Sequence, residues 1–284
     1  MSFSKIGVIG AGVMGTGVAV DLILNDISVV IVDISLDILE KAKAEILNTT
    51  RLAPLLRKTA PKLANKDILK KIHFTIEIGH VRSCQFIIEN VTEDWDIKSK
   101  IYRELDKICD SKVCFGVNTS CLSITKIASL TKRQDKIIGI HLMNPVYLKT
   151  YVEVIRGFHT TDESIEIVNQ LMKQINKSAI VVNDYPGFVS NRISHLFINE
   201  AAFVVQDQVA SPEQVDAIFK QCYNHKMGPL ETADLIGLDT VVNSLNVLYE
   251  SYQDSKFRCC PLLKKMVDAG QLGRKVGKGF YEYN

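Results

Sequence analysis

A glycine-rich turn near the start of the chain constrains the fold more than any other feature. The turn, Gly10-Ala11-Gly12-Val13-Met14-Gly15, follows the apolar run Lys5–Gly10 and opens a stretch of helical character, Val13–Asn25. In this pattern Gly10 permits a tight bend, Gly12 lets the backbone approach a pyrophosphate, and Gly15 allows close packing of helix on strand. The N-terminus of the helix attracts anions. The turn therefore predicts a dinucleotide site whose contacts include Gly10, Gly12, Val13, Met14 and Gly15.

An acidic residue after the next apolar run indicates which dinucleotide is bound. Asp33 ends the run Ser28–Asp33, 23 residues after Gly10, and Ile34 and Ser35 follow it. A carboxylate at this position can accept hydrogen bonds from the adenine-ribose hydroxyls and repels a 2′-phosphate. No arginine follows that would hold such a phosphate. NAD is favoured over NADP, while FAD stays open as an alternative on these residues alone.

Short apolar runs alternate with helical stretches through the first half of the chain. After the helical stretch Asp37–Thr50, further runs occupy Gln85–Val91, Val113–Asn118 and Lys136–His141. Strands that are buried on both faces have this composition, and their alternation with helices predicts a doubly wound parallel sheet of the α/β class.

The pattern changes after Asp184, where Tyr185-Pro186-Gly187 interrupts it. The later periodic segments predict helices, and Ser211-Pro212 is a typical helix start. These segments are Phe188–Asp207, Pro212–Tyr223, Leu238–Tyr252 and Pro261–Ala269. We therefore expect an α/β domain over residues 1–184 and an all-helical domain over residues 185–284.

Composition argues against several classes of protein. The 34 basic and 32 acidic residues leave a net charge of +2 without long runs of like charge, which argues against nucleic acid or a membrane surface as partner. The apolar runs are too short to span a membrane, and we expect no targeting segment before the first strand. The seven cysteines are odd in number and lack CxxC spacing. They predict reduced thiols in the cytoplasm and no metal site.

A histidine and a glutamate follow the glycine turn as candidates for acid–base chemistry. His141 ends an apolar run, where open α/β sheets bind their ligands, and Glu153 lies inside the next run, Tyr151–Ile155. A neutral histidine can take the proton of an alcohol, and a carboxylate behind it would orient the ring. Taken alone, His141 is more often a satisfied residue at a strand end. The acid, however, is costly in an apolar run unless it is paired.

Several motifs in one order resemble the 3-hydroxyacyl-CoA dehydrogenase family along essentially the whole chain. They are Gly10-Ala11-Gly12-Val13-Met14-Gly15, Asn118-Thr119-Ser120, His141-x-x-Asn144-Pro145, Val152-Glu153-Val154, Pro186-Gly187-Phe188-Val189-x-Asn191-Arg192, Met227-Gly228-Pro229 and Gly277-x-Gly279-Phe280-Tyr281. Many motifs at matching spacings are more specific than any single one.

The resemblance implies a Rossmann-type domain, followed by a helical domain that binds substrate and forms a homodimer. The implied activity is NAD-dependent oxidation of the 3-hydroxyl of an acyl thioester. His141 is then the base, Glu153 its partner, and Ser120 and Asn191 hydrogen-bond the substrate near the reacting oxygen. The implied cofactor contacts are Asp33, Glu93, Lys98, Asn118, Ser120, Asn144 and Lys275. Separately, Ser120 could cap a helix, Asn191 could join helices, and Lys275 could be a solvated residue.

The chain departs from the family where the family holds the nucleotide of CoA. Counted from Asp33, the family's serine and lysine fall on Thr49 and Leu56, although Arg57 and Lys58 follow directly. The missing lysine predicts a thioester on an acyl carrier protein in place of CoA. In addition, Tyr147 follows the Asn-Pro pair and predicts a narrower or more polar pocket.

A second resemblance points the same way. Glu89–Glu93, Met227–Asp239 and Leu248–Tyr252 are similar to a branch found with polyketide and peptide synthetases, which makes hydroxymalonyl- or aminomalonyl-carrier protein. The main expectation is therefore a short polar acyl group, glyceryl or seryl, on an acyl carrier protein. The alternatives are an ordinary 3-hydroxybutyryl-CoA dehydrogenase, a dehydrogenase of free 3-hydroxy acids, and a non-catalytic NAD-binding structural protein.

Overall fold

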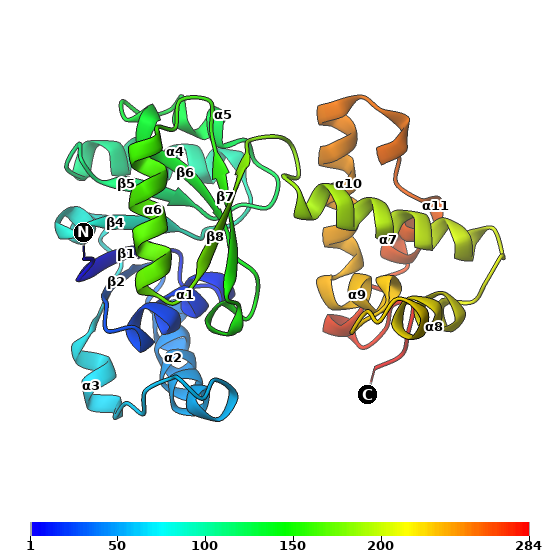
Figure 1. Ribbon diagram of the computed structural model, residues 1–284, viewed down its shortest axis with the longest axis horizontal. Coiled ribbons are helices and arrows are strands. Elements are labelled where there is room, and N and C mark those ends of the chain that lie inside the picture. Colours follow the sequence, from blue (N-terminus) through cyan, green and yellow to red (C-terminus); the bar gives the residue numbers. More distant parts are fainter. Residues whose placement is uncertain (1, 284) are drawn as a thin grey trace. The chain divides into compact units, whose positions relative to one another are not determined.

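The computed structural model describes residues 2–283 and divides into two compact units (Figure 1). The units are Met1–Asp184 and Tyr185–Asn284. Each unit buries its own apolar cluster. Within the described residues no helix combines the length and the apolar character that crossing a bilayer requires.

The first unit is built on one eight-stranded sheet with the strand order β3-β2-β1-β4-β5-β6-β7-β8. The strands are β1 Lys5–Ile9, β2 Ser28–Val32, β3 Ile72–Thr75, β4 Phe86–Glu89, β5 Cys114–Val117, β6 Ile137–His141, β7 Tyr151–Arg156 and β8 Ser178–Asn183. Because β1 pairs with both β2 and β4, the strand order reverses at β1. Such a reversal opens a crevice at the carboxyl ends of the strands, and this is where open α/β sheets bind ligands.

The expectation of a parallel sheet needs one correction. The first six strands are parallel, but β7 runs antiparallel to β6, and β8 is parallel to β7. The connection over residues 142–150 is short and contains only the 3-10 turn η3 Val146–Leu148. A parallel neighbour needs a crossover of a dozen or more residues, whereas an antiparallel one does not.

Two strands at the edges of the sheet were not foreseen in the sequence. β3 is short, and every residue of β8 is at least partly exposed, including Ile180 and Val181. An edge strand faces solvent along one side, so it lacks the continuous apolar run by which central strands are recognised.

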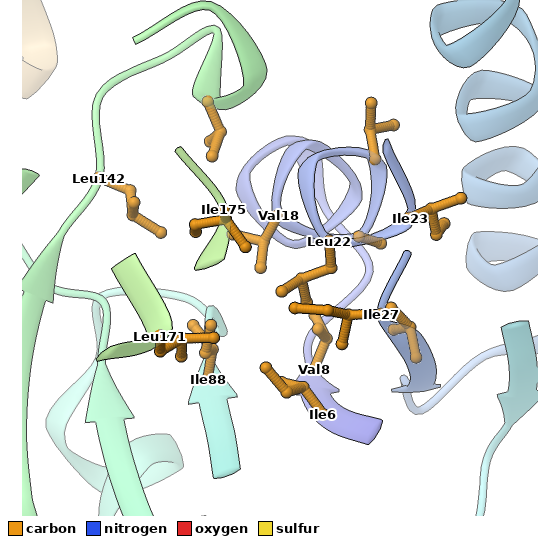
Figure 2. Packing of buried hydrophobic residues seen from close by; sticks show 14 of the residues in the cluster. Ile6, Val8, Val18, Leu22, Ile23, Ile27, Ile88, Leu142, Leu171 and Ile175 are labelled. Carbon is orange, nitrogen blue, oxygen red and sulfur yellow. The ribbon is translucent and has the colours of Figure 1, made fainter. Parts of the chain in front are cut away.

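The helices of the first unit are α1 Val13–Leu24, α2 Leu36–Leu56, α3 Asn65–Lys70, α4 Trp95–Ile108, α5 Ile124–Ala128 and α6 Asp162–Gln174, with 3-10 turns η1 Ile78–Ser83 and η2 Gln134–Lys136. Figure 2 shows Val18 and Leu22 of α1 packed beside Val8 of β1. Most residues of α1 are buried. This packing fixes the direction of α1, so its N-terminus stays at the carboxyl end of β1.

The second unit is helical, as expected. Its elements are α7 Ser190–Gln206, α8 Pro212–Cys222, α9 Pro229–Ile236, α10 Leu238–Tyr252 and α11 Pro261–Asp268, with η4 Ser255–Phe257 and η5 Arg274–Val276. Ser211 caps α8 in a capping box with Gln214. The sequence analysis did not predict α9. It treated the residues at the start of this helix only as part of the motif Met227-Gly228-Pro229.

Two buried carboxylates explain motifs of the second unit. Asp216 accepts hydrogen bonds from the backbone N–H groups of Leu230 and Glu231, and Asp234 accepts from those of Phe280 and Tyr281. A Cβ atom on Gly228 would lie 2.2 Å from Asp216, and one on Gly279 would lie 2.1 Å from Asp234. These two glycines therefore serve packing.

Candidate active site

The three glycines of the turn have different structural requirements. Gly10 has a φ of +89°, which favours glycine, and a Cβ atom on Gly15 would lie 1.8 Å from the carbonyl oxygen of Gly10. A Cβ atom on Gly12 would meet nothing within 4 Å. Gly10 and Gly15 are thus required by the backbone itself, whereas Gly12 faces open space beside the first turn of α1. The N–H groups of that turn have no partner within the helix.

Asp33 lies directly after β2 and is fixed by the turn. Its Oδ2 accepts a hydrogen bond of 2.7 Å from the N–H of Ala11, and its Oδ1 accepts one of 2.7 Å from the N–H of Ile34. A cavity of about 490 Å³ opens beside it. The cavity is lined by Gly10, Gly12, Asp33 and, among others, Ile34, Ile76 and Ile97. Mostly apolar walls, with the Asp33 carboxylate beside the glycine turn, fit the adenosine half of NAD, so the residues present suit this cofactor.

A buried ion pair supports the loops beside this cavity. The Lys98 ammonium group lies 2.8 Å from both carboxylate oxygens of Glu89 and donates a hydrogen bond to the carbonyl oxygen of Asn118. Burial raises the pKa of the Glu89 carboxyl, against the lowering effect of Lys98. The Asn118 amide joins Asn90 to the N–H of Leu142. Lys98 is fully buried, so the structure shows it as a support of the loop.

Glu93 shapes the loop that carries Ser120. One of its carboxylate oxygens accepts hydrogen bonds from the Thr119 hydroxyl, from the N–H of Ser120 at 3.0 Å and from the N–H of Cys121 at 3.1 Å. The Lys98 ammonium group lies 3.8 Å from this side chain. Glu93 therefore acts on the position of Ser120 at the carboxyl end of β5.

His141 and Glu153 face each other across the antiparallel pair β6 and β7. They occupy directly paired positions in the register, and His141 Nδ1 lies 2.9 Å from Glu153 Oε2. Both side chains are buried to nine-tenths or more. The Ser120 Oγ lies 3.2 Å from His141 Nε2. The structure thus brings together Ser120, His141 and Glu153, which are far apart in the sequence.

The geometry assigns the proton positions on the histidine ring. An ionised carboxylate only accepts hydrogen bonds, so Nδ1 of His141 carries the proton and donates to Glu153. Nε2 of the neutral ring is then an acceptor, and the Ser120 hydroxyl donates to it. This is the protonation state in which a histidine can take a proton from an alcohol.

Asn144 lies on a second cavity of about 520 Å³. The cavity is bounded by α1, by α2 and by the segment that follows Asn144, and its lining includes Gly17, Lys41, Thr49 and Tyr147. Thr49 lies where the sequence suggested a role in holding the carrier. Arg57 is not available as a substitute for the missing lysine, because its guanidinium lies 3.3 Å from Asp21.

The predicted contacts Val13 and Met14 lie in the first turn of α1, and two further predicted residues belong to the second unit. Asn191 lies in the first turn of α7, where its carbonyl oxygen accepts a hydrogen bond of 2.9 Å from Nδ1 of His195. The Lys275 ammonium group lies 2.6 Å from both carboxylate oxygens of Asp239. The contact of Lys275 with the cofactor stays a prediction.

Sequence reasoning missed the buried polar residues that support the site. Glu89 ends the apolar strand Phe86–Glu89. Burying an unpaired acid is costly, and this argument, which identified Glu153, applies equally to Glu89. Asp21 is an acid within a helix that is otherwise mostly apolar, and this was also a usable signal. Among residues 2–283 no group of three His, Cys, Asp or Glu side chains is arranged to hold a metal ion.

A doubly wound sheet with this glycine turn and acid, next to a histidine–glutamate pair, defines an NAD-dependent dehydrogenase that acts on an alcohol. Comparison with known proteins agrees. The family model "3-hydroxyacyl-CoA dehydrogenase, NAD binding domain" matches residues 5–185, and the model of the C-terminal domain of the same family matches residues 187–283. The chain belongs to the 3-hydroxyacyl-CoA dehydrogenase family.

Individual relatives are similar over nine-tenths or more of their length. A probable 3-hydroxybutyryl-CoA dehydrogenase from Deinococcus radiodurans is 42% identical over 98% of this chain and 100% of its own. A mitochondrial hydroxyacyl-coenzyme A dehydrogenase from Sus scrofa is 32% identical over 98% of this chain and 90% of its own. The crystal structure of (S)-3-hydroxybutyryl-CoA dehydrogenase from Ralstonia eutropha has a TM-score of 0.93 at 40% identity, covering 100% of both chains.

Replacing Asp33 by serine is expected to raise the KM for NAD by about tenfold to a hundredfold, since hydrogen bonds to a charged group contribute about 1.5–3 kcal/mol. The substitution also removes the acceptor of the Ala11 N–H. Initial rates at varied NAD and NADP measure the change, and Asp67→Ser on α3 is the matched control, because its side chain is half exposed and lines neither cavity of the first unit described here. An unchanged KM for NAD would exclude the proposed contact with the ribose.

Proposed function

We propose that this protein oxidises the 3-hydroxyl of a short-chain acyl-CoA such as 3-hydroxybutyryl-CoA, with NAD as the hydride acceptor. The observation that carries the proposal is the contact of 2.9 Å between His141 Nδ1 and Glu153, which makes Nε2 the basic atom. Membership of the 3-hydroxyacyl-CoA dehydrogenase family supports the choice of a thioester substrate.

The residues of the chain account for the movement of the proton. NAD, when bound, supplies the acceptor for the hydride that leaves C3 of the substrate. His141 takes the hydroxyl proton at Nε2 and becomes an imidazolium. Glu153 stabilises this cation and keeps the ring oriented, an effect that burial strengthens. In the reverse direction the imidazolium returns the proton to the carbonyl oxygen.

We propose roles in this reaction for several further residues. Ser120 lies 3.2 Å from His141 Nε2, so its hydroxyl is placed to hydrogen-bond the same substrate oxygen as the base. Asn191 is proposed as a second donor to that oxygen. We propose the glycine turn, Asp33 and Asn144 as contacts of NAD. Glu93 and Lys98 are proposed to affect the cofactor site indirectly, by holding the loop that carries Ser120. Lys275 is proposed as a contact of NAD on the family resemblance alone.

The relatives favour CoA over an acyl carrier protein. Proteins that are 39–42% identical over nearly the whole chain carry the name 3-hydroxybutyryl-CoA dehydrogenase, with or without the word probable. The carrier-protein expectation depended on the missing lysine at Leu56 and on the branch resemblance. The presence of Lys41 and Thr49 on the second cavity offers another cation and a hydroxyl to a CoA-bound substrate.

Matched substrates test the proposal directly. The formation of NADH is measured with 3-hydroxybutyryl, glyceryl and seryl groups, each on CoA and on a phosphopantetheinylated carrier protein. We expect the highest kcat/KM with 3-hydroxybutyryl-CoA. Turnover confined to glyceryl- or seryl-carrier protein would replace the proposal by the extender-unit activity. Binding of NAD without turnover of any thioester would favour a non-catalytic protein.

The second unit is proposed to form a homodimer. Among its exposed apolar side chains are Val189, Ile193, Val209, Ile218 and Leu235. The proposal rests on the family resemblance, and these side chains are candidate contacts. Homodimers with two-fold symmetry are the commonest assembly. Light scattering after size-exclusion chromatography measures the mass, and a monomer at micromolar concentration would exclude the dimer.

A further inference from the structure

A buried group of charges joins the segment after Asn144 to two helices. The Asp21 carboxylate of α1, 1% exposed, lies 3.0 Å from the Lys177 ammonium group and 3.3 Å from the Arg57 guanidinium. Lys177 directly precedes β8, and Arg57 directly follows α2. One acid in α1 thus pairs with two cations that come from different parts of the first unit.

Both cations also hold backbone oxygens of one short segment. Lys177 donates hydrogen bonds to the carbonyl oxygens of Val146, at 2.6 Å, and Lys149. Arg57 donates to the carbonyl oxygen of Tyr147 at 3.4 Å. The segment 146–149 therefore has its carbonyl groups held from two sides, while Asp21 offsets part of the positive charge of the two groups that hold it.

The same segment is a wall of the second cavity. Val146 and Tyr147 line that cavity together with residues of α1 and α2. A Cβ atom on Gly17 would lie 3.2 Å from the side chain of Val146, so the segment packs directly on α1. The charged group thus contacts all three walls of the cavity: α1 through Asp21, the end of α2 through Arg57, and the segment through its carbonyl oxygens.

Stability alone is a weak explanation for this group. Removing an acid and a cation from water costs several kcal/mol per ion, and apolar residues of similar size often serve stability as well or better. Burial accordingly raises the pKa of the Asp21 carboxyl, against the lowering effects of Lys177 and Arg57. What apolar residues cannot supply is a set of directed bonds to three carbonyl oxygens in an irregular segment.

We propose that Asp21, Lys177 and Arg57 are positioning residues that hold segment 146–149 as a preformed wall of this cavity and so set its affinity for the CoA portion of the substrate. The part concerning CoA rests on the proposed function, whereas the part concerning the segment does not. A preformed wall lowers the ordering cost of binding, so its loss acts on affinity more than on the chemical step.

The test compares Lys177→Met with Arg133→Met as the matched control. Arg133 is also a buried cation that pairs with an acid, Asp106, and donates to backbone carbonyl groups, but it lies before the amino end of β6 and lines none of the cavities described above. Lys177→Met is expected to raise the KM for 3-hydroxybutyryl-CoA about tenfold with kcat within about threefold, a change of about 1.4 kcal/mol in binding. Arg133→Met is expected to lower thermal stability and leave this KM within about twofold.

Two further readouts do not depend on turnover. Calorimetry with CoA alone should show the same loss of affinity in Lys177→Met. Hydrogen exchange at the amides of Leu148 and Lys149, which donate to Pro145 and Val146, should be faster in Lys177→Met than in Arg133→Met. Arg57→Gln, which removes a more exposed cation, is expected to give a smaller change in the same direction and serves if Lys177→Met does not fold.

The outcomes separate the two proposals. If KM, CoA affinity and exchange at these amides change no more in Lys177→Met than in Arg133→Met, the positioning role is wrong. If the unmodified protein oxidises no thioester, the proposed function is wrong. The exchange comparison then still decides whether the three residues hold the segment.

Discussion

Replacement of His141 by glutamine is expected to lower kcat by about 10²–10⁴-fold, the usual contribution of a positioned general base. Glutamine can fill part of the space and form hydrogen bonds, but it cannot take a proton at neutral pH. The affinity for NAD is expected to change little, because the cavity beside Asp33 does not include His141. Stopped-flow measurement of NADH formation in a single turnover isolates the chemical step.

The matched control for this variant is His159→Gln. His159 is an exposed histidine of the same unit, and it lies after β7 in contact with the ring of Phe158. It should retain the activity of the unmodified protein. A His141→Gln protein that is folded, binds NAD and keeps kcat within about threefold would exclude His141 as the base.

Replacement of Glu153 by glutamine is expected to lower kcat by about 10²–10³-fold through the orientation and charge of the base. The amide has nearly the shape of the carboxylate, so the packing of β7 is preserved. It lacks the negative charge that stabilises the imidazolium, and its NH₂ group can favour the other tautomer of His141 by donating to Nδ1. The KM for the thioester is expected to change by less than about threefold, since Glu153 acts behind the histidine.

Steady-state kinetics and a double variant check this second expectation. Glu166→Gln, on the exposed side of α6, is the control for a change from acid to amide. The double variant His141→Gln with Glu153→Gln should be no slower than His141→Gln alone, because the glutamate acts only through the histidine. Additive losses in the double variant would show that Glu153 has a separate role.

The amino-acid sequence was sufficient to predict the central part of the sheet. Runs such as Ser28–Val32 and Ile137–His141 are apolar because both faces of a central strand are covered, so they are recognisable without any tertiary information. The glycine turn was recognisable for a similar reason. Gly10 and Gly15 are required by the local backbone geometry, so the glycine pattern can be recognised without tertiary information.

The pairing of His141 with Glu153 was predicted as a hypothesis, and its physical origin lies in the sheet. The two residues are twelve positions apart, and only the antiparallel register of β6 and β7 places them opposite each other. The sequence suggested strands at both positions. The sequence analysis expected a parallel sheet. In a parallel arrangement the short connection between β6 and β7 could not have placed the two strands side by side.

What the sequence determined by itself is whatever follows from local pattern: the glycine turn, the central strands, the helical second half and the family. What only the tertiary structure decided is the direction of β7, the edge strands β3 and β8, and the joint contact of Asp21, Lys177 and Arg57 with segment 146–149. The physical reason is that an apolar run reports burial at its own position. A hydrogen bond to a backbone carbonyl leaves no trace in the identity of the residue that accepts it.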